Sequence, residues 1–350
     1  MDDKLKMAEM SLSFCIPTYN RCEILHENVL EILKCEDPDI EVVVLDNGST
    51  DNTLSMLQTI NDKRLSIYSN GVNKGFLFNI LNAVNKGKGK YLIFCTDKDK
   101  FLSREIPKFK SVLLNQPDIA AGFCQYYSDS NRDFNRIDRG FPAVREIAYH
   151  ARHPTGYFFN RSLINHLHIT ENYFDFEIVD LFPFEFIFGD LCMLGDAIIY
   201  YPTIIQTESG VMAAKIKSFG TNGSSKKAFF MPESRLHMAI NFCQHINTLS
   251  ISVKEKSTLQ AEVFMRGLIG ASFGYKNILN NENLCTHYGM QSRKIGTFEM
   301  LKIGFTYSKK FIFKNFFQVK SNSTQNILFI NFLFLFLSRS IFKKIRNLFR

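Results

Sequence analysis

The first hundred residues alternate between short apolar runs of strand type and segments whose apolar residues recur at helical spacing. This alternation is typical of βαβ units, and it predicts an α/β fold with a mostly parallel central sheet. The predicted strands are Leu12–Ile16, Ile40–Leu45, Leu65–Tyr68 and the apolar run that begins at Tyr91, and the predicted helices are Glu23–Lys34, Asn52–Ile60 and Phe78–Val84. We expect the first strand to end at Pro17, because proline does not continue a central strand.

A polar cluster follows each of these four strands. The clusters are Thr18–Arg21, Asp46–Asp51, Asn70–Gly75 and Asp97–Asp99. The carboxyl ends of parallel strands lie at one edge of a sheet, where open α/β folds bind their ligands. We therefore expect the four clusters to converge there.

Asp97 and Asp99 stand one residue apart, directly after a buried strand. Side chains at i and i+2 of an extended segment face the same way. Two hard oxygen ligands suit Mg²⁺ or Mn²⁺, which can take phosphate oxygens as further ligands. The pair indicates a metal–diphosphate site, and the alternative is a solvated turn that closes the strand.

The composition bounds the possibilities. With 350 residues and 45% hydrophobic residues, the chain can form one large domain or one domain with a smaller appendage. Its eight cysteines show neither C-x-x-C nor zinc-site spacing, so we interpret them as reduced core residues of a cytosolic protein. The N-terminus has acids and no apolar segment, which is unlike a secretory signal.

Positive charge is concentrated at the C-terminus. The formal net charge is +8, no Asp or Glu follows Glu299, and residues 301–350 carry ten Lys and Arg, so the rest sums to 8 − 10 = −2. A nucleic-acid-binding domain would spread its positive charge over the folded core, so we expect no nucleic acid partner.

The C-terminal tail is amphipathic. Apolar and basic residues alternate at helical spacing over 341–350, which favours a cationic amphipathic helix on a membrane surface over a final helix packed on the domain. The apolar run Ile327–Leu337 is shorter than the ~20 residues that a spanning helix needs.

The remaining segments suggest three regions. We predict a domain at 1–225, with a nucleotide-binding half at 1–105 and an acceptor half at 106–225, then a helical region at 226–320 and a membrane-associating tail at 321–350. Within them we expect strands at Ile119–Tyr126 and Ala197–Tyr201, helices at Asp180–Leu194 (after Pro183), Pro232–Ile246 and Lys254–Leu279, and loops at Asp129–Gly140 and Ser209–Lys227.

Four linked motifs resemble the family 2 glycosyltransferases of the GT-A fold, of the kind that assembles bacterial surface polysaccharides. They are Ser13–Arg21, Val42–Asp51, Asn73–Phe76 with Asn79, and Thr96–Asp99. The segments His153–Gly156 and Pro183–Pro202 look, more loosely, like the acceptor half of such enzymes. The resemblance implies an inverting, metal-dependent transfer of a hexosyl or N-acetylhexosaminyl group from a nucleotide-diphosphate sugar, such as a UDP-sugar, to a hydroxyl group.

The resemblance also implies a role for individual residues. The nucleotide base and ribose would be lined by Pro17, Thr18 and Tyr19, with Arg21 beside them, and Asp46, next to Ser49, would accept from the base imide. The ribose and sugar pocket would be shaped by Asn73, Gly75 and Asn79. Asp97 and Asp99 would hold Mn²⁺ or Mg²⁺ as a D-x-D pair. Lys98 stands where the family often has a third acid, so the pair is intact but one negative charge is missing.

The resemblance implies a general base near the start of a helix, before a Gly and a strand. Gly195 and the strand after it point to Glu185, and Asp180 and Asp190 are alternatives. Glu185 could instead be an acid that the helix dipole favours. We expect a structural role for His150, His153, His166 and His168, since no ligand spacing accompanies them.

The implied acceptor is a glycan or a lipid-linked glycan, and the implied location is the inner face of the cell membrane, with the tail as a peripheral anchor. The alternative from another class is a non-catalytic nucleotide-binding or scaffold protein on the membrane. A nucleotidyltransferase would need a Gly-rich basic loop after the first strand, and a dehydrogenase would need G-x-G-x-x-G there; the sequence has neither.

Overall fold

The computed structural model describes residues 10–128, 130–173, 182–206, 229–287, 290–318 and 329. The chain divides into two compact units, Met1–Gly210 and Val211–Arg350, which are described separately. The predicted membrane-associating tail at 321–350 lies outside the described residues, apart from Phe329.

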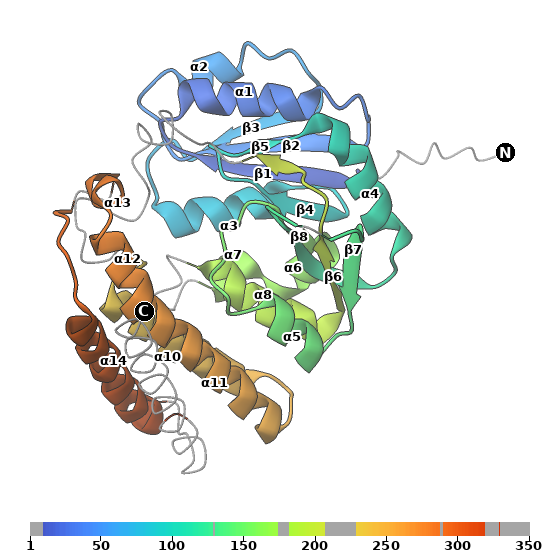
Figure 1. Cartoon of the computed structure of the whole chain (residues 1–350). Helices are drawn as coiled ribbons and strands as arrows, with labels where there is room; N and C mark the ends of the chain where they lie inside the picture. Colours follow the sequence, from blue (N-terminus) through green and yellow to red (C-terminus); the bar gives the residue numbers. More distant parts are fainter. Residues whose placement is uncertain are drawn as a thin grey trace. The chain divides into compact units, whose positions relative to one another are not determined.

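The first unit is built on an eight-stranded sheet in the order β3-β2-β1-β4-β8-β6-β9-β7 (Figure 1). The pairs β1–β2, β1–β4, β2–β3 and β6–β9 are parallel, which confirms a mostly parallel α/β sheet, whereas β4–β8, β6–β8 and β7–β9 are antiparallel. The strands are β1 (Leu12–Thr18), β2 (Ile40–Asp46), β3 (Leu65–Ser69), β4 (Tyr91–Phe94), β6 (Ile119–Cys124), β7 (Phe134–Ile137), β8 (Tyr157–Asn160) and β9 (Asp196–Tyr200), and a small second sheet pairs β5 (Lys100–Phe101) with β10 (Ile205–Gln206).

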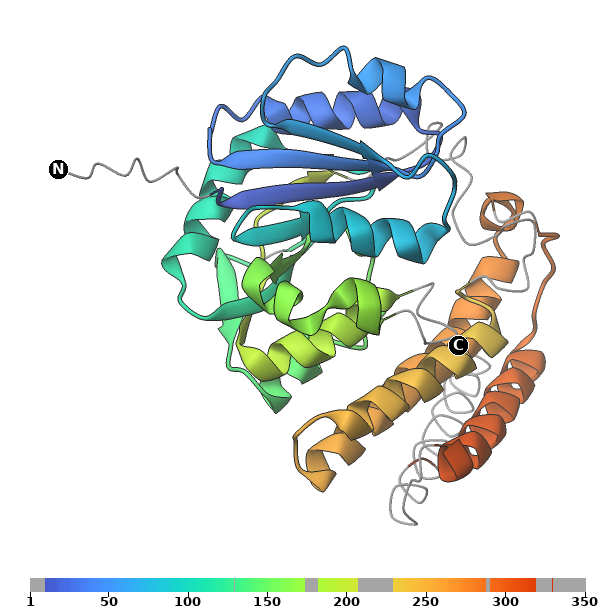
Figure 2. The same cartoon turned by 180° about the vertical axis from the view of Figure 1, so that it is seen from behind.

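Helices cover both faces of this sheet (Figures 1 and 2). Alternate residues of β1 and β2 face a core shared with α1, as Phe14 and Val42 do with Val29. On the opposite face α3 lies against β1, and the Cys15 thiol approaches the carbonyl of Val84 at 4.0 Å. The helices of this unit are α1 (Cys22–Leu33), α2 (Thr53–Leu57), α3 (Phe76–Lys86), α4 (Ile106–Asn115), α5 (Phe141–Ile147), α6 (Arg161–Leu167), α7 (Ile169–Asn172) and α8 (Pro183–Leu194).

The expected end of the first strand at Pro17 is wrong. Strand β1 continues to Thr18, with Pro17 opposite Leu45 and Thr18 opposite Asp46 of β2. Pairing with β4 stops at Cys15, opposite Phe94. Pro17 therefore lies where the strand has a partner on one side only, so its missing N–H breaks no ladder.

The loop predicted at 129–140 contains strand β7. Phe134, Asn135 and Arg136 are only partly buried, and Ile137 is buried. The strand pairs antiparallel with β9 at the edge of the sheet, with Phe134 opposite Tyr200 and Ile137 opposite Ala197. An edge strand has one neighbour and need not be continuously apolar, which explains why composition hid it.

The second unit is helical within the described residues. Its helices are α10 (Pro232–Thr248), α11 (Val253–Ile269), a π-helical turn (Gly270–Gly274), α12 (Tyr275–Leu279), α13 (Glu282–His287) and α14 (Thr297–Gln318). Ser252 and Glu255 form a capping box at the start of α11, which satisfies two amides of its first turn. Within the described residues, no helix has both the length and the apolar character to cross a bilayer.

Candidate active site

The four polar turns converge at one edge of the sheet, as expected. Thr18 lies opposite Asp46 on the neighbouring strand, and its hydroxyl donates to Asp97 Oδ2 at 3.1 Å. From α3, the Asn79 amide donates to the carbonyls of Thr18 at 3.4 Å and Leu45 at 3.2 Å. Side chains from the ends of β1, β2 and β4 and from the start of α3 therefore meet in one polar cluster.

Asp46 is fully buried and holds the turn after β2. Its Oδ2 accepts from the amides of Gly48 at 3.0 Å and Ser49 at 3.1 Å, and from the Ser69 hydroxyl at 3.1 Å. Gly48 has φ +75°, and a Cβ there would lie 2.6 Å from the backbone of Val72, so this position requires glycine. The predicted base-reading residue is thus also the residue that shapes its own loop.

An asparagine network joins the turns after β2 and β3. Asn70 donates to the side-chain oxygens of Asn47 and Asn79, each at 3.0 Å. Asn47 in turn donates to Asn73 Oδ1 at 3.0 Å and to the Gly75 carbonyl at 3.2 Å. Asn73, Gly75 and Asn79 were predicted site residues, whereas Asn47 and Asn70 were not singled out. Their only sequence signal is an asparagine directly behind each strand.

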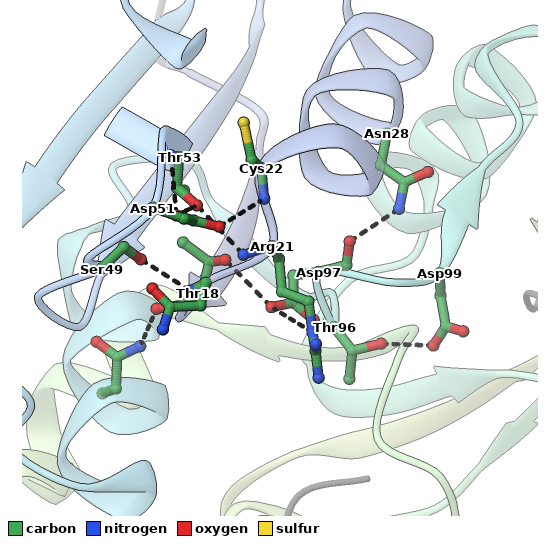
Figure 3. Close-up of polar contacts among 12 residues, drawn as sticks. Thr18, Arg21, Cys22, Asn28, Ser49, Asp51, Thr53, Thr96, Asp97 and Asp99 are labelled. Atoms are coloured by element: carbon green, nitrogen blue, oxygen red, sulfur yellow. Dashed lines mark hydrogen bonds and ion pairs between the residues drawn. The ribbon is translucent and has the colours of Figure 1, made fainter. Parts of the chain in front are cut away.

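The turn after β1 is fixed by the loop after β2 (Figure 3). Asn20 adopts φ 54°. The backbone N–H of Asn20 donates to Ser49 Oγ at 2.9 Å, and the backbone N–H of Arg21 donates to Thr53 Oγ1 at 3.2 Å. This geometry places Arg21 Nε 4.0 Å from Asp97 Oδ2. Pro17 is buried and Tyr19 half-buried beside this turn.

Asp97 is 5% exposed. Burial raises its pKa to about 6, and the attraction of Arg21 and the hydrogen bond from Thr18 only partly oppose this. Its main-chain carbonyl accepts from the Asn28 amide at 3.0 Å (Figure 3). Thr18 of β1 therefore holds the carboxylate and Asn28 of α1 holds the backbone of Asp97, at a cost in desolvation of the carboxylate.

We expect Asp97→Asn to stabilise the metal-free protein at pH 8. An aspartate whose folded pKa lies above its ordinary value binds protons more tightly when folded, so its ionisation costs stability as the pH rises through about 6. A shift of roughly two pKa units corresponds to about 3 kcal/mol at most, and the gain should shrink toward pH 4. Urea unfolding in EDTA at both pH values measures this.

Asp196→Asn is the matched control. Asp196 pairs with Arg136 at 2.6 Å, which with hydrogen bonds from Arg136 and Arg139 outweighs burial and lowers its pKa. Its removal should therefore destabilise the protein at pH 8. Equal losses of stability in both variants would contradict the prediction for Asp97.

Asp99, 3% exposed, is clamped by two hydroxyl groups. Thr96 Oγ1 and Thr155 Oγ1 each donate to Asp99 Oδ2 at 2.6 Å, and the two hydroxyls lie 2.8 Å apart. His153 Nδ1 lies 3.6 Å from the same oxygen and 2.7 Å from the Tyr126 hydroxyl. Sequence reasoning gave His153 a structural role and assigned Thr155 no role of its own within the segment His153–Gly156; the fold brings both to Asp99.

Asp97 and Asp99 lie in a turn after β4, where the Asp99 amide donates to the Thr96 carbonyl at 3.3 Å, and not on the extended segment assumed from the sequence. The carboxylate oxygens of these two aspartates still suit a divalent cation. In each, the hydrogen bonds that fix the carboxylate reach Oδ2, and no donor from the described residues reaches Oδ1. Each aspartate thus keeps one hard oxygen for an ion. The described residues contain no group of three or more His, Cys, Asp or Glu arranged to hold a metal, so water or a ligand would have to supply the remaining oxygens.

Glu185 lies at the start of α8 and is 1% exposed. Its Oε2 accepts from the His150 amide at 2.9 Å, and its Oε1 accepts from the Tyr157 hydroxyl at 3.1 Å and the Arg152 amide at 3.3 Å. Burial raises its pKa, and the nearby charge of Arg152 is the largest opposing effect. It lines a small pocket together with Phe94, Arg152, Pro154, Tyr157 and Phe184.

Asp190 and Asp180 are the alternative candidates for the general base. Asp190 is partly buried on α8 and accepts from the Tyr173 hydroxyl. Asp180 lies outside the described residues. Of the two candidate bases that the structure describes, Glu185 lines the pocket and Asp190 does not.

Residues 13–184 match the sequence profile of the family described as Glycosyl transferase family 2. This segment is a family 2 glycosyltransferase domain. It contains β1 to β4 and all four polar turns, and it ends at the first turn of α8.

Characterised and uncharacterised bacterial glycosyltransferases are similar to this domain. The abequosyltransferase RfbV of Salmonella typhimurium is 36% identical over 115 residues, which are 31% of this chain and 34% of that protein. A GalNAc(5)-diNAcBac-PP-undecaprenol β-1,3-glucosyltransferase of Campylobacter jejuni is 30% identical over 95 residues, which are 26% of this chain and 31% of that enzyme. The chain thus spans about a third of the length of these relatives.

The fold is that of solved GT-A enzymes. The crystal structure of residues 1–349 of S. aureus TarS in complex with UDP-GlcNAc superposes with a TM-score of 0.55 at 16% identity, over 91% of this chain and 88% of that one. This likeness confirms the predicted fold of the glycosyltransferase domain.

Proposed function

We propose that this protein is an inverting, metal-dependent glycosyltransferase. It transfers a sugar from a UDP-sugar to a hydroxyl of a glycan or lipid-linked acceptor during surface polysaccharide assembly. The observation that carries the proposal is the convergence of the four polar turns, with Asp97 and Asp99 among them, inside the family 2 domain.

The donor nucleotide would lie across the ends of β1, β2 and β3. The base and ribose would be contacted by Pro17, Thr18 and Tyr19, with Arg21 beside them, and Asp46, next to Ser49, would read the base. Asp46 suits this role because its position is fixed by three donors before any ligand arrives. Asn73, Gly75 and Asn79 would border the ribose and sugar, held by the amides of Asn47 and Asn70.

The diphosphate would lie beside Asp97 and Asp99. Their Oδ1 atoms would hold Mn²⁺ or Mg²⁺, which when bound neutralises charge on the leaving diphosphate. Thr18, Thr96 and Thr155 prevent the two carboxylates from rotating away by holding their Oδ2 atoms. Arg21, beside Asp97, would add a positive charge near the phosphates.

Glu185 is the proposed general base. A carboxylate accepts about four hydrogen bonds, and three are in use, so one site remains for an acceptor hydroxyl. Burial, which raises its pKa, makes it a stronger proton acceptor than an exposed glutamate. Attack by the deprotonated hydroxyl from the face opposite the diphosphate inverts the anomeric centre.

The names of two relatives support the choice of substrates. One, from Escherichia coli, is named as a UDP-Glc:α-D-GlcNAc-diphosphoundecaprenol glucosyltransferase and is 25% identical over 149 residues. The Campylobacter relative is likewise named for an undecaprenol-linked acceptor. A lipid-linked acceptor would place this protein on the inner face of the cell membrane, with the basic tail at 321–350 as a peripheral anchor.

Nucleotide binding tests the proposal most directly. UDP with Mn²⁺ at 100 times its dissociation constant should stabilise the protein by about 2.7 kcal/mol, and less when EDTA replaces the metal. Stabilisation without sugar transfer or donor hydrolysis would favour the non-catalytic alternative. Equal stabilisation in EDTA would contradict the metal assignment.

Thr155→Val should weaken metal-dependent UDP binding about 10-fold or more, the usual effect of losing a group that orients a ligand residue. Valine has the size of threonine but cannot donate to Asp99 Oδ2. Thr155→Ser keeps the hydroxyl and should restore affinity close to wild type. Titration of UDP in Mn²⁺ and in EDTA measures both variants. If serine and valine weaken binding equally, Thr155 does not act through its hydroxyl.

A further inference from the structure

Helix α14 is apolar on two opposite sides. One side is buried in the helical unit, where Met300 is 2% exposed, Tyr307 3% and Phe311 0%. The opposite side of a helix with one buried face is normally polar. On α14 that side instead carries Phe298, which is 81% exposed, and Phe305, which is 53% exposed.

Two exposed lysines, Lys302 and Lys309, lie between the aromatic residues on the same side. The series continues to Phe313, which is 65% exposed. These positions are i, i+4, i+7, i+11 and i+15, so they form one stripe along the helix. This stripe, called the Phe/Lys face, consists of Phe298, Lys302, Phe305, Lys309 and Phe313.

The Phe/Lys face has no carboxylate. Glu299 is the last acid of the sequence, and it pairs with Arg293 at 2.7 Å. Neither Lys302 nor Lys309 has an ion pair among the described residues. The surface is therefore both apolar and positively charged, and its partner must accept phenyl rings and neutralise ammonium groups together.

We propose that the Phe/Lys face docks on an anionic lipid bilayer. A helix lying in the interface places aromatic rings at the headgroup–acyl boundary, while lysine side chains extend to the phosphates. Each lysine near an anionic surface increases partitioning about fivefold. The proposal concerns binding alone and does not depend on the proposed transfer reaction.

The chain's own C-terminal segment fits this face less well than a bilayer does. Residues 319–350 contain no Asp or Glu and carry six Lys and Arg, namely Lys320, Arg339, Lys343, Lys344, Arg346 and Arg350. Such a segment would be repelled by Lys302 and Lys309. It would instead be attracted to the same anionic surface.

Vesicle co-sedimentation of the full chain tests the proposal. The probes are phosphatidylcholine vesicles with and without phosphatidylserine, and the variants are F298S/F305S and K302Q/K309Q. The first should weaken binding to phosphatidylserine vesicles about 10-fold or more. The second should weaken it by about 25-fold and leave binding to phosphatidylcholine vesicles unchanged.

The matched control is V253S/K254Q on α11, which changes an exposed valine and an exposed lysine away from α14. It should bind as the wild type does, and circular dichroism should show all variants folded. Wild-type affinity in both face variants would overturn the proposal, and so would absence of wild-type binding. A change from dimer to monomer in the face variants, without loss of vesicle binding, would assign the face to a second copy instead.

Discussion

Replacing Asp99 with alanine should lower kcat/KM for sugar transfer about 100- to 1000-fold while the protein stays folded. Asp99 Oδ1 is one of the two oxygens proposed to hold the cation, and stabilisation of charge at the leaving group is worth several kcal/mol, with each 1.36 kcal/mol equal to a factor of ten. Transfer should be measured at several Mn²⁺ concentrations, because partial loss of metal affinity would be recovered at high Mn²⁺.

Asp99→Asn refines this experiment. Asparagine keeps an oxygen that can accept from Thr96 and Thr155, so the local hydrogen bonds survive while the charge is lost. Asp133→Ala is the control, since Asp133 is exposed and pairs with Lys108 at 2.6 Å outside the site. Metal-dependent turnover at the wild-type rate in Asp99→Ala would remove the central assignment.

Glu185→Gln should lower kcat by about 100- to 10,000-fold, the usual contribution of a general base. UDP binding in Mn²⁺ should be unchanged, because the partners of the Glu185 carboxylate, His150, Arg152 and Tyr157, all lie in the acceptor half. The change also removes a buried charge, so its unfolding free energy must be measured alongside.

The pH profile gives a second readout for Glu185. Only the deprotonated carboxylate can accept the proton, and burial raises its pKa above the ordinary 4.5. In the wild type, kcat should therefore fall with acid at a pH above 4.5. Asp190→Asn is the matched variant on the same helix. If it abolishes transfer and Glu185→Gln does not, the base is Asp190.

Local pattern was sufficient for the elements that surround the donor site. The apolar runs at Ile40 and Tyr91 and the helical spacing from Glu23 predicted β2, β4 and α1 within one or two residues. Such elements are recognisable because each buries a regular face on the core of one sheet. The order of polar clusters behind those strands then predicted the edge at which they meet.

Local rules failed where a strand had only one neighbour. Strand β1 can continue through Pro17 because its pairing with β4 ends at Cys15, opposite Phe94. Strand β7 forms because β9 lies beside it. Neither partner is visible in the residues concerned. The same limitation applies to α14, where the exposed Phe298 and Phe305 resemble core residues until the buried side of the helix is known.

The sequence by itself determined the first four strands, the polar turns behind them and the presence of the D-x-D pair, because apolar runs and the residues that end them are local signals. Only the tertiary structure decided what holds Asp99. Strand β8 pairs antiparallel with β4, the Gly156 amide donates to the Phe94 carbonyl at 2.8 Å, and this brings Thr155 to a residue 56 positions earlier. A hydroxyl that meets its carboxylate across two strands leaves no periodic trace in the sequence, since the pairing is made by the fold.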